Sequence, residues 1–394
     1  MISYYKPIRI ILILFLLLIC GKTSFAQTDS VTVNNDKTVV LTSKFLGEKR
    51  TIWIHLPSDY STTSTTYPVL YLLDGGNHFK YVSEAVEYLA GYDRNRMPQM
   101  IVVAILNVDR TRDFTPIHSL LFDGKVDTTK MGKTGGGPKF LQFIKNELVP
   151  YVDKNYRTEP YRILSAHSLG GIFALYVKEA APDLFQANIL ISPAIYGGNT
   201  KILTDFAPFL QSHQQLRGKN FISIGNENRQ KVDSLMLVLK TTAPTSFTWK
   251  FEQYPDENHF SVTYKSVYDG LRFIYSNWFI DYYSQIKMSM TDINAHFSKL
   301  SDEFGYTINP SEDLLNNCGY QQLNLKNMDE AIGIFKENVQ KHPTSSNAYD
   351  SLGEAYMRNG NKVLAIKNYK RSIELNPGNT SGKETLKKLE SNMN

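Results

Sequence analysis

Two uninterrupted apolar runs constrain the fold more than any other feature of this 394-residue chain. They are Val69–Leu73 and Met100–Leu106, and a helical pattern around Tyr81–Leu89 separates them. A strand that is apolar on both faces must be covered on both faces, and strands that alternate with helices pair in parallel. The pattern therefore predicts a doubly wound, mostly parallel α/β sheet, with functional residues at the carboxyl ends of its strands.

The alternation of strands and helices continues to about residue 280. Runs of β-branched and aromatic residues indicate strands, and apolar residues at helical spacing indicate helices. The further strands expected are Val31–Val33, Val39–Leu41, Arg50–Pro57, Tyr161–Ser165, Ala187–Ile191, Phe221–Ile224 and Phe247–Gln253. The further helices expected are Pro138–Tyr151, Gly170–Ala181, Gln230–Thr241 and Ser261–Ile280. Residues 27–283 are therefore predicted to form one large α/β domain.

From Ser311 onward the chain consists of polar helical segments with an internal period of 34 residues. The period relates Gly319 to Gly353, Ala331 to Ala365, Ile332 to Ile366, Phe335 to Tyr369 and Pro343 to Pro377. It resembles two tetratricopeptide repeats, in which small residues lie where paired helices touch. We expect a helical linker at 284–310, and at 311–394 an all-α segment of two repeats with a capping helix at Ser381–Asn392.

Residues 1–26 have the pattern of a secretory signal peptide. Lys6 and Arg9 precede the apolar run Ile10–Cys20, and Ser24–Ala26 is a small-x-small cleavage site. The run is too short to cross a bilayer as a helix. We expect cleavage and export to the periplasm or the medium, with no membrane span afterwards. The alternatives are an uncleaved anchor and lipid attachment at Cys20, which the preceding isoleucine disfavours.

Charge and cysteine content exclude several classes of partner and site. The 43 basic and 38 acidic residues come closer to balance without the signal peptide, so neither nucleic acid nor an anionic membrane is an expected partner. Only Cys20 and Cys318 exist, and the first leaves with the signal peptide. The mature chain can therefore form no internal disulfide and no cysteine-based metal site. Cys318 lies on an apolar helical stripe, which favours a buried packing role over a reactive thiol.

The segment Tyr161–Leu175 has the strand-turn-helix pattern of a nucleophile elbow centred on Ser168. The turn is so tight that small residues must lie two positions either side of the serine, and here they are Ala166 and Gly170. A helix that starts just after the serine directs its positive end at a developing oxyanion, so the Leu169 N–H is an expected donor. The alternative is a serine that only caps the helix.

A nucleophilic serine needs a base and an acid, which follow it in that fold in the order acid, then histidine. His259 follows the last expected strand through a loop and is the predicted base; His213, His296 and His342 lie in less suitable segments. Glu227 is the first carboxylate after the strand Phe221–Ile224 and is the predicted acid. Asp233, Asp256 and Glu257 remain alternatives for that role.

The turn after the strand Val69–Leu73 is the expected source of the second oxyanion donor. Gly75 and Gly76 allow close approach of the backbone there. Asn77, Arg112 and His167 are the further candidates for the substrate pocket, although Arg112 could equally form a structural clamp with the neighbouring Asp113. The glycine-rich segment 132–137 follows no strand and lacks Lys-Ser/Thr, so phosphate binding is not expected.

Several motifs together resemble the "putative esterase" family of α/β hydrolases, a group that includes esterase D, feruloyl esterases and siderophore esterases. They are Pro68–Gly75, Arg110–Pro116, Phe140–Arg157, the Ser168 elbow, Ser192-Pro193 and Asn258–Val262. The resemblance covers about residues 40–280 and implies cleavage of small or medium esters through an acyl-enzyme, with no cofactor and no metal. Alanine at 166 and glutamate at the acid position depart from the family pattern, and some siderophore-esterase relatives work with a Ser-His pair.

Three functions fit these observations. The first is an exported carboxylic ester hydrolase, and the second is an acyltransferase that uses the same residues but passes the acyl group to another alcohol. The third is an interaction protein whose repeats bind a protein partner while the hydrolase domain is idle. Labelling by a fluorophosphonate separates the first two from the third, and product analysis separates the first from the second.

Overall fold

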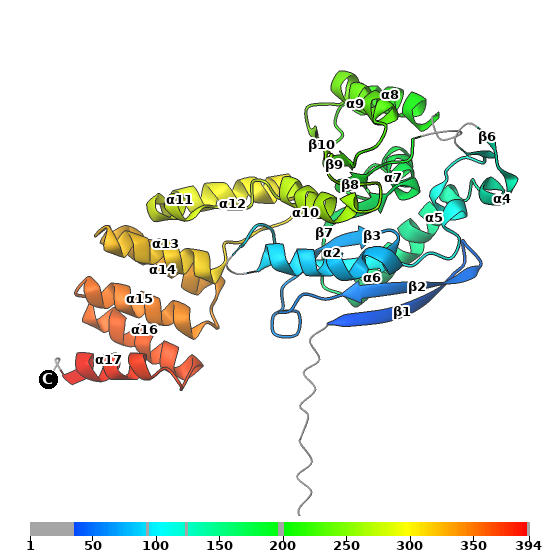
Figure 1. The fold of residues 1–394 in the computed structure, drawn as a ribbon. Helices are drawn as coiled ribbons and strands as arrows, with labels where there is room; N and C mark the ends of the chain where they lie inside the picture. Colours follow the sequence, from blue (N-terminus) through cyan, green and yellow to red (C-terminus); the bar gives the residue numbers. More distant parts are fainter. Residues whose placement is uncertain (1–34, 92–93, 123–124, 196–200, 392–394) are drawn as a thin grey trace, which may run out of the picture. The chain divides into compact units, whose positions relative to one another are not determined.

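The computed structural model describes residues 35–91, 94–122, 125–195 and 201–391 (Figure 1). The predicted signal peptide, the expected strand Val31–Val33 and the predicted Cys20 alternative lie outside these residues. No helix among the described residues is long and apolar enough to cross a membrane. The segment from Asp36 onward forms one compact unit.

The main sheet has eight strands in the order β1-β2-β4-β3-β7-β8-β9-β10. Their bounds are β1 Asp36–Ser43, β2 Glu48–His55, β3 Tyr67–Leu72, β4 Ile101–Ile105, β7 Thr158–His167, β8 Ala187–Ile191, β9 Gly218–Ile224 and β10 Phe247–Gln253. Strand β2 is antiparallel to both of its neighbours, and the strands from β4 to β10 are parallel. The predicted mostly parallel sheet is confirmed.

Helices cover both faces of this sheet, as the apolar strands require (Figure 1). One core includes side chains of α5 (Gly137–Phe143), η1 (Ile144–Leu148), α6 (Val149–Asn155), α7 (Leu169–Ala180), α8 (Lys201–Ser212) and α9 (Gln230–Thr242). The other includes side chains of α2 (Gly75–Ala90), α10 (Val262–Ile274) and α12 (Met290–Phe304). The expected helix at 138–151 is thus a longer run with one π turn, and α8 was not predicted.

Strand order places two carboxyl ends side by side in the middle of the sheet. From β3 the chain moves to β4 on one side, and it later returns to β7 on the other side of β3. Loops that leave β3 and β7 therefore diverge to opposite sides, which opens a crevice between them. The residues that follow are Asp74 after β3 and Ser168 after β7.

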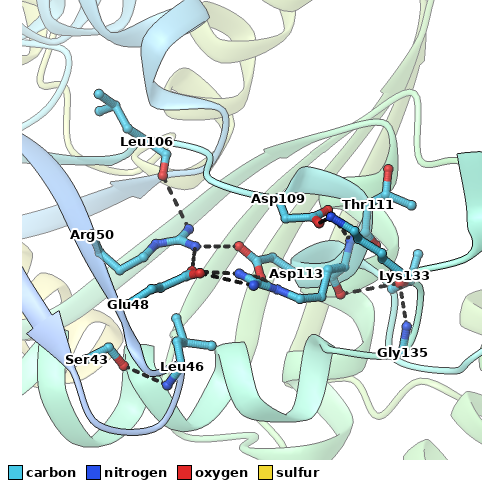
Figure 2. Close-up of polar contacts among 12 residues, drawn as sticks. Ser43, Leu46, Glu48, Arg50, Leu106, Asp109, Thr111, Asp113, Lys133 and Gly135 are labelled. Atoms are coloured by element: carbon cyan, nitrogen blue, oxygen red, sulfur yellow. Dashed lines mark hydrogen bonds and ion pairs between the residues drawn. The ribbon is translucent and has the colours of Figure 1, made fainter.

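A partly buried ion-pair network joins β2 to the short helix α3 (Arg110–Phe114), as Figure 2 shows. The Arg50 side chain is fully buried, and its guanidinium lies 2.6 Å from the carboxylate of Asp113 and 2.8 Å from that of Glu48. Arg112 binds the same two carboxylates, at 2.6 Å from Glu48 and 2.7 Å from Asp113. Each buried charge therefore has an opposite partner, and together they fix α3 against the sheet.

The glycine-rich segment after this helix packs against it. The Gly136 N–H donates to the Arg112 carbonyl at 3.0 Å, and the Gly137 N–H donates to the Thr115 carbonyl at 3.0 Å. A Cβ on Gly136 would lie 2.5 Å from Arg112 Cγ, so a larger residue would push the helix away. The hairpin of β5 (Leu121–Phe122) and β6 (Lys125–Val126) and the short helix α4 (Thr128–Met131) precede this segment.

His55 joins the outer strands to the helix that covers them. Its Nδ1 lies 2.8 Å from an Asp36 carboxylate oxygen on β1, and its Nε2 lies 3.0 Å from a Glu87 carboxylate oxygen on α2. Burial alone would lower the pKa of His55, but the two carboxylates outweigh it and hold the pKa above its ordinary value.

Seven helices follow α10 in the described chain. They are α11 (Tyr282–Lys287), α12, α13 (Glu312–Asn324), α14 (Met328–Lys341), α15 (Ser346–Arg358), α16 (Lys362–Leu375) and α17 (Thr380–Ser391). A Cβ on Gly319 would lie 2.6 Å from the Phe335 ring, and one on Gly353 would lie 3.2 Å from the Tyr369 ring. The 34-residue period therefore pairs a glycine of one helix with an aromatic ring of the next.

Cys318 and Phe304 are both buried, and their surroundings show what each side chain packs against. Cys318 is fully buried, and burial raises the pKa of its thiol to about 11, so it stays a protonated thiol and packs in the core of the helices. Phe304 of α12, a helix assigned to a linker by sequence, lies 4.9 Å from the Tyr161 ring and 5.0 Å from the Tyr275 ring. Helix α12 is thus part of the hydrophobic core on that face of the sheet.

Candidate active site

Ser168 occupies the sharp turn between β7 and α7. Its φ of 59° and ψ of −118° lie in a region that a residue with a side chain rarely adopts. The turn is held because the Ser168 N–H donates to the Ile191 carbonyl at 2.9 Å and the Ser168 carbonyl accepts from Gly171 and Ala194. Such backbone strain at a serine between a strand and a helix is the geometry of a nucleophile elbow.

Alanine at position 166 fits this elbow. A Cβ on Gly170 would lie 3.6 Å from the Ala166 Cβ and 3.4 Å from Leu73, which is ordinary contact. The tighter position is Gly171, where a Cβ would lie 2.9 Å from Pro193. The departure from the usual glycine at position 166 therefore does not disturb the turn.

Ser168, His259 and Glu227 form one hydrogen-bonded chain. His259 Nε2 lies 3.1 Å from Ser168 Oγ, and its Nδ1 lies 2.8 Å from Glu227 Oε2. The loops that carry these residues come from the ends of β7, β9 and β10, three strands of the same sheet. The structure brings together the three residues that the sequence selected for nucleophile, base and acid.

Glu227 is held by groups other than the histidine. The Ser192 hydroxyl donates to Glu227 Oε1 at 2.5 Å, and the Gly225 N–H lies 3.4 Å from the same oxygen. Burial would raise the pKa of Glu227, but the hydrogen bonds from His259 and Ser192 reverse this and leave the pKa below its ordinary value. Glu227 therefore remains a carboxylate at neutral pH and accepts the Nδ1–H of His259.

The acid loop and the histidine loop pack directly on each other. A Cβ on Gly225 would lie 2.6 Å from the Glu257 carbonyl oxygen, so only glycine permits this approach. The Asn226 N–H donates to that carbonyl at 2.6 Å. The other acids considered have different partners: Asp233 pairs with Arg229, Glu257 pairs with Lys265, and the Asp256 side chain is exposed.

His167, directly before Ser168 in the sequence, supports the backbone of His259. Its Nε2 lies 2.8 Å from the backbone carbonyl oxygen of His259, which can only accept, so Nε2 carries the hydrogen. Burial and the neighbouring charge of His259 lower the pKa of His167 to about 4. The His167 ring is therefore neutral at physiological pH, and its Nε2–H donates to the His259 carbonyl oxygen.

A pocket of about 480 Å³ opens at Ser168. Its walls come from the turn after β3, from α2 and α3, from the elbow and from the histidine loop. The lining residues are Asp74, Asn77, His78, Tyr81, Arg110, His167, Ser168, His259, Phe260 and Thr263. The sequence had named Asn77, His167, Ser168 and His259 of these.

Arg110 and Asp74 are the main residues of this pocket that the sequence analysis missed. Arg110 Nε donates to Asp74 Oδ1 at 2.6 Å, and its NH2 group donates to Asp74 Oδ2 at 2.9 Å and to the His167 carbonyl at 3.1 Å. The Asp74 side chain is almost fully buried, and its backbone adopts the left-handed conformation, with φ 55°. Its position directly after a buried strand was an available signal, since the carboxyl ends of such strands carry the site.

The structure corrects the prediction for Arg112. It lies outside the pocket lining, because Glu48 and Asp113 hold its guanidinium in the ion-pair network that joins β2 to α3. Arg110, two residues earlier, lines the pocket in its place. The alternative of an Arg-Asp structural clamp describes what Arg112 and Asp113 do.

The predicted oxyanion donors lie at the starts of two helices. Leu169 is the first residue of α7, and Gly75 and Gly76 are the first two residues of α2. N–H groups in the first turn of a helix have no partner within that helix. A Cβ on Gly75 would lie 2.9 Å from Ala104 Cβ, so close packing on β4 is one reason for that glycine. Their contacts with an oxyanion stay predictions.

Both parts of the chain resemble known protein families. Residues 43–252, just over half of the chain, match the family described as "Putative esterase", and residues 346–379, the second predicted repeat, match the tetratricopeptide repeat family. The ferri-bacillibactin esterase BesA of Bacillus subtilis is 28% identical over 232 residues, which cover 55% of this chain and 73% of that protein.

Two solved structures resemble the fold. An IroE-like serine hydrolase from Shewanella oneidensis has 27% sequence identity and a TM-score of 0.67, and the match covers 76% of this chain and 98% of that one. A protein from Capnocytophaga ochracea has 15% identity and a TM-score of 0.67, with 90% of this chain and 99% of that one covered. The second likeness concerns the fold alone.

Proposed function

The chain belongs to the esterase family and is an esterase joined to a tetratricopeptide repeat segment, and from this premise we propose that it is an exported serine carboxylic ester hydrolase. One observation carries the proposal. The strained Ser168 contacts His259, and His259 contacts the ionised Glu227, at 3.1 Å and 2.8 Å. This arrangement can remove a proton from a hydroxyl and return it to a leaving alcohol.

The proposed reaction has two halves. Ser168 Oγ attacks the ester carbonyl carbon while its proton passes to His259 Nε2, and Glu227 stabilises the imidazolium that forms. The alcohol then leaves with the proton from Nε2, and the acyl group remains on Ser168. Water attacks this acyl-enzyme with His259 again as the base, which releases the acid and restores the serine.

The negative charge on the carbonyl oxygen requires donors that are in place before the reaction. We assign the Leu169 N–H at the start of α7 as one donor, because it adjoins the nucleophile and lies at the positive end of a helix. Gly75 or Gly76 at the start of α2 is the proposed source of the second. Helix α2 follows β3, the strand that pairs with the nucleophile strand β7.

The size and walls of the pocket support a small or medium ester. A volume of about 480 Å³ accommodates such a molecule, and the aromatic side chains of Tyr81 and Phe260 provide apolar surface near the reacting serine. Since a relative at 28% identity is named a ferri-bacillibactin esterase, siderophore esters come first in a substrate screen. Feruloyl esters and p-nitrophenyl esters of graded acyl length complete it.

The test of the mechanism combines labelling with turnover. Wild-type protein should react with a fluorophosphonate probe, and Ser168→Ala should lose labelling and turnover, by about a million-fold as for other such nucleophiles, with an unchanged Tm. Ser234→Ala, which removes an exposed serine on α9, is the matched control and should keep both. More than about a tenth of the wild-type activity in Ser168→Ala would contradict the mechanism, since such losses are usually far larger.

Two further assays address the finer parts of the proposal. Products analysed with and without alcohol or sugar acceptors distinguish hydrolysis from acyl transfer, because both begin from the same acyl-enzyme. Cell fractionation with N-terminal sequencing of the mature protein tests export and cleavage after Ala26. An intact N-terminus in the cytoplasmic fraction would contradict export.

A further inference from the structure

Three side chains in the pocket form a cluster of a kind that the ester hydrolase mechanism does not need. Asp74, His78 and His167 each offer a carboxylate oxygen or ring nitrogen, and these three atoms lie within 4.8 Å of one another. Asp74 and His167 are almost fully buried, and His78 is partly buried. Two imidazoles and one carboxylate, with a side open to the pocket, are a ligand set that suits zinc and similar ions.

The two histidines are held as metal-binding histidines usually are. Each has one ring nitrogen engaged by an oxygen: His167 Nε2 donates to the His259 carbonyl at 2.8 Å, and His78 Nδ1 lies 3.0 Å from the Tyr81 hydroxyl oxygen. The neutral His167 ring therefore carries a lone pair on Nδ1, and His78 carries one on Nε2 in the tautomer whose Nδ1 donates to the Tyr81 oxygen. Such outer partners fix the tautomer and the direction of a ligating ring.

Asp74 retains the capacity for one further contact. A carboxylate has about four lone-pair sites. In the described structure Asn107 and Arg110 Nε occupy two on Oδ1, both at 2.6 Å, and Arg110 NH2 occupies one on Oδ2 at 2.9 Å. One site on Oδ2 remains. The Arg110 cation opposes a second positive charge, so binding should be weaker than at a closed structural zinc site.

We propose that Asp74, His78 and His167 bind a divalent transition-metal ion such as Zn²⁺ in the pocket, and that the bound ion blocks access of an ester to Ser168. His167 directly precedes Ser168, and all four residues line the same pocket of about 480 Å³. An ion with its bound waters would therefore occupy space that the ester needs. The proposed metal binding is independent of the proposed function, whereas the proposed inhibition rests on that function.

Binding is tested directly in the absence of turnover. Ser168→Ala protein is titrated with Zn²⁺ by calorimetry and with Co²⁺ by visible absorption, which reports the coordination geometry of the bound ion. We expect one site per chain, and we expect His78→Phe in the same background to weaken binding at least about tenfold, the size of effect expected even for outer-shell changes. His213→Gln, a change to an exposed histidine after α8, is the matched control and should bind as before.

Zinc bound by the proposed catalytic base His259 would also inhibit the enzyme, and the His78→Phe variant separates that case from binding at the proposed site. If His78→Phe keeps the full affinity, or if the Ser168→Ala protein binds no Zn²⁺ at about millimolar concentration, the proposed site is refuted. Inhibition is then measured, for the wild type and for each variant that keeps activity, as the Zn²⁺ concentration that halves the activity of that same protein. That concentration should rise at least about tenfold in His78→Phe relative to wild type. Zinc binding without inhibition would refute the inhibitory part alone.

Discussion

Replacing Glu227 by glutamine removes the negative charge behind His259 while the shape of the side chain is kept. In the wild type, His259 Nδ1 lies 2.8 Å from Glu227 Oε2, and the amide oxygen of the glutamine can still accept from this nitrogen. The Ser192 hydroxyl, which contacts the other carboxylate oxygen, still has the amide group as its partner. What is lost is the charge that stabilises the imidazolium in the transition state. The variant therefore measures the electrostatic contribution of the acid separately from its role in orientation.

The structure sets the expected size of the effect. A hydrogen bond to a charged group contributes about 1.5–3 kcal/mol, and each 1.36 kcal/mol is a factor of ten in rate. The side chains of His259 and Glu227 are 32% and 26% exposed, so water compensates for part of the loss. We expect kcat/KM of Glu227→Gln to fall about 10- to 150-fold, less than the roughly 10⁴-fold known for a buried triad acid.

The assay is steady-state hydrolysis of one p-nitrophenyl ester by wild type and variants, with Tm measured alongside. Asp233→Asn and Glu257→Gln are the matched controls, because each removes another carboxylate near the acid or histidine loop that is paired elsewhere. Both should retain wild-type kcat/KM within about twofold, as surface changes usually do. A loss of less than about threefold in Glu227→Gln, or an equal loss in Asp233→Asn, would refute Glu227 as the acid.

Three further predictions concern stability. The folded-state pKa of His55 is raised above 6.5, so its stabilising ion pairs are fully present below pH 6.5 and are lost as the pH rises through the folded-state pKa. His55→Gln should therefore lower Tm more at about pH 5.5 than at about pH 8.5. An equal loss of Tm at both pH values would contradict this prediction. Asp113→Leu leaves the buried Arg50 without one carboxylate and should cost about 3–5 kcal/mol by chemical denaturation; adding Arg50→Met should recover part of that cost, and no recovery would argue against a charge effect. Gly319→Ala, whose Cβ would lie 2.6 Å from an aromatic ring, should cost about 1–3 kcal/mol, whereas Gly333→Ala, with nothing within 4 Å, should stabilise by up to about 1 kcal/mol; thermal melts that rank the two the other way would refute the packing argument.

Features encoded by neighbouring residues were accessible from the sequence. The apolar runs around residues 69–73 and 100–106 correspond to β3 and β4, because a strand buried on both faces needs apolar side chains at every position. The elbow was equally local, since the strand, the serine and the small residues that relieve its turn are consecutive. Glu227 and His259 followed from their order after the serine and from the strand ends that carry them.

Features that depend on contacts between distant segments were not accessible. Arg110 and Arg112 lie two residues apart on α3, and only the fold decides that the first reaches Asp74 and the second reaches Glu48. Helix α8 was missed because it contains Pro208 and follows a polar stretch, both of which oppose a helix on local grounds. Its apolar side chains Phe206 and Leu210 are nevertheless buried in the core, and this packing overrides the local preference.

The contact of Phe304 with Tyr161 has a consequence for how the chain folds during synthesis. Strand β7, which ends just before Ser168, is translated about 140 residues before the helix that covers its first half. At about 5–20 residues per second, the Tyr161 ring waits up to roughly half a minute on the ribosome for Phe304, and the later Tyr275 ring waits up to about six seconds. A polypeptide released early, before residue 304, would leave these aromatic rings open to water and to other nascent chains.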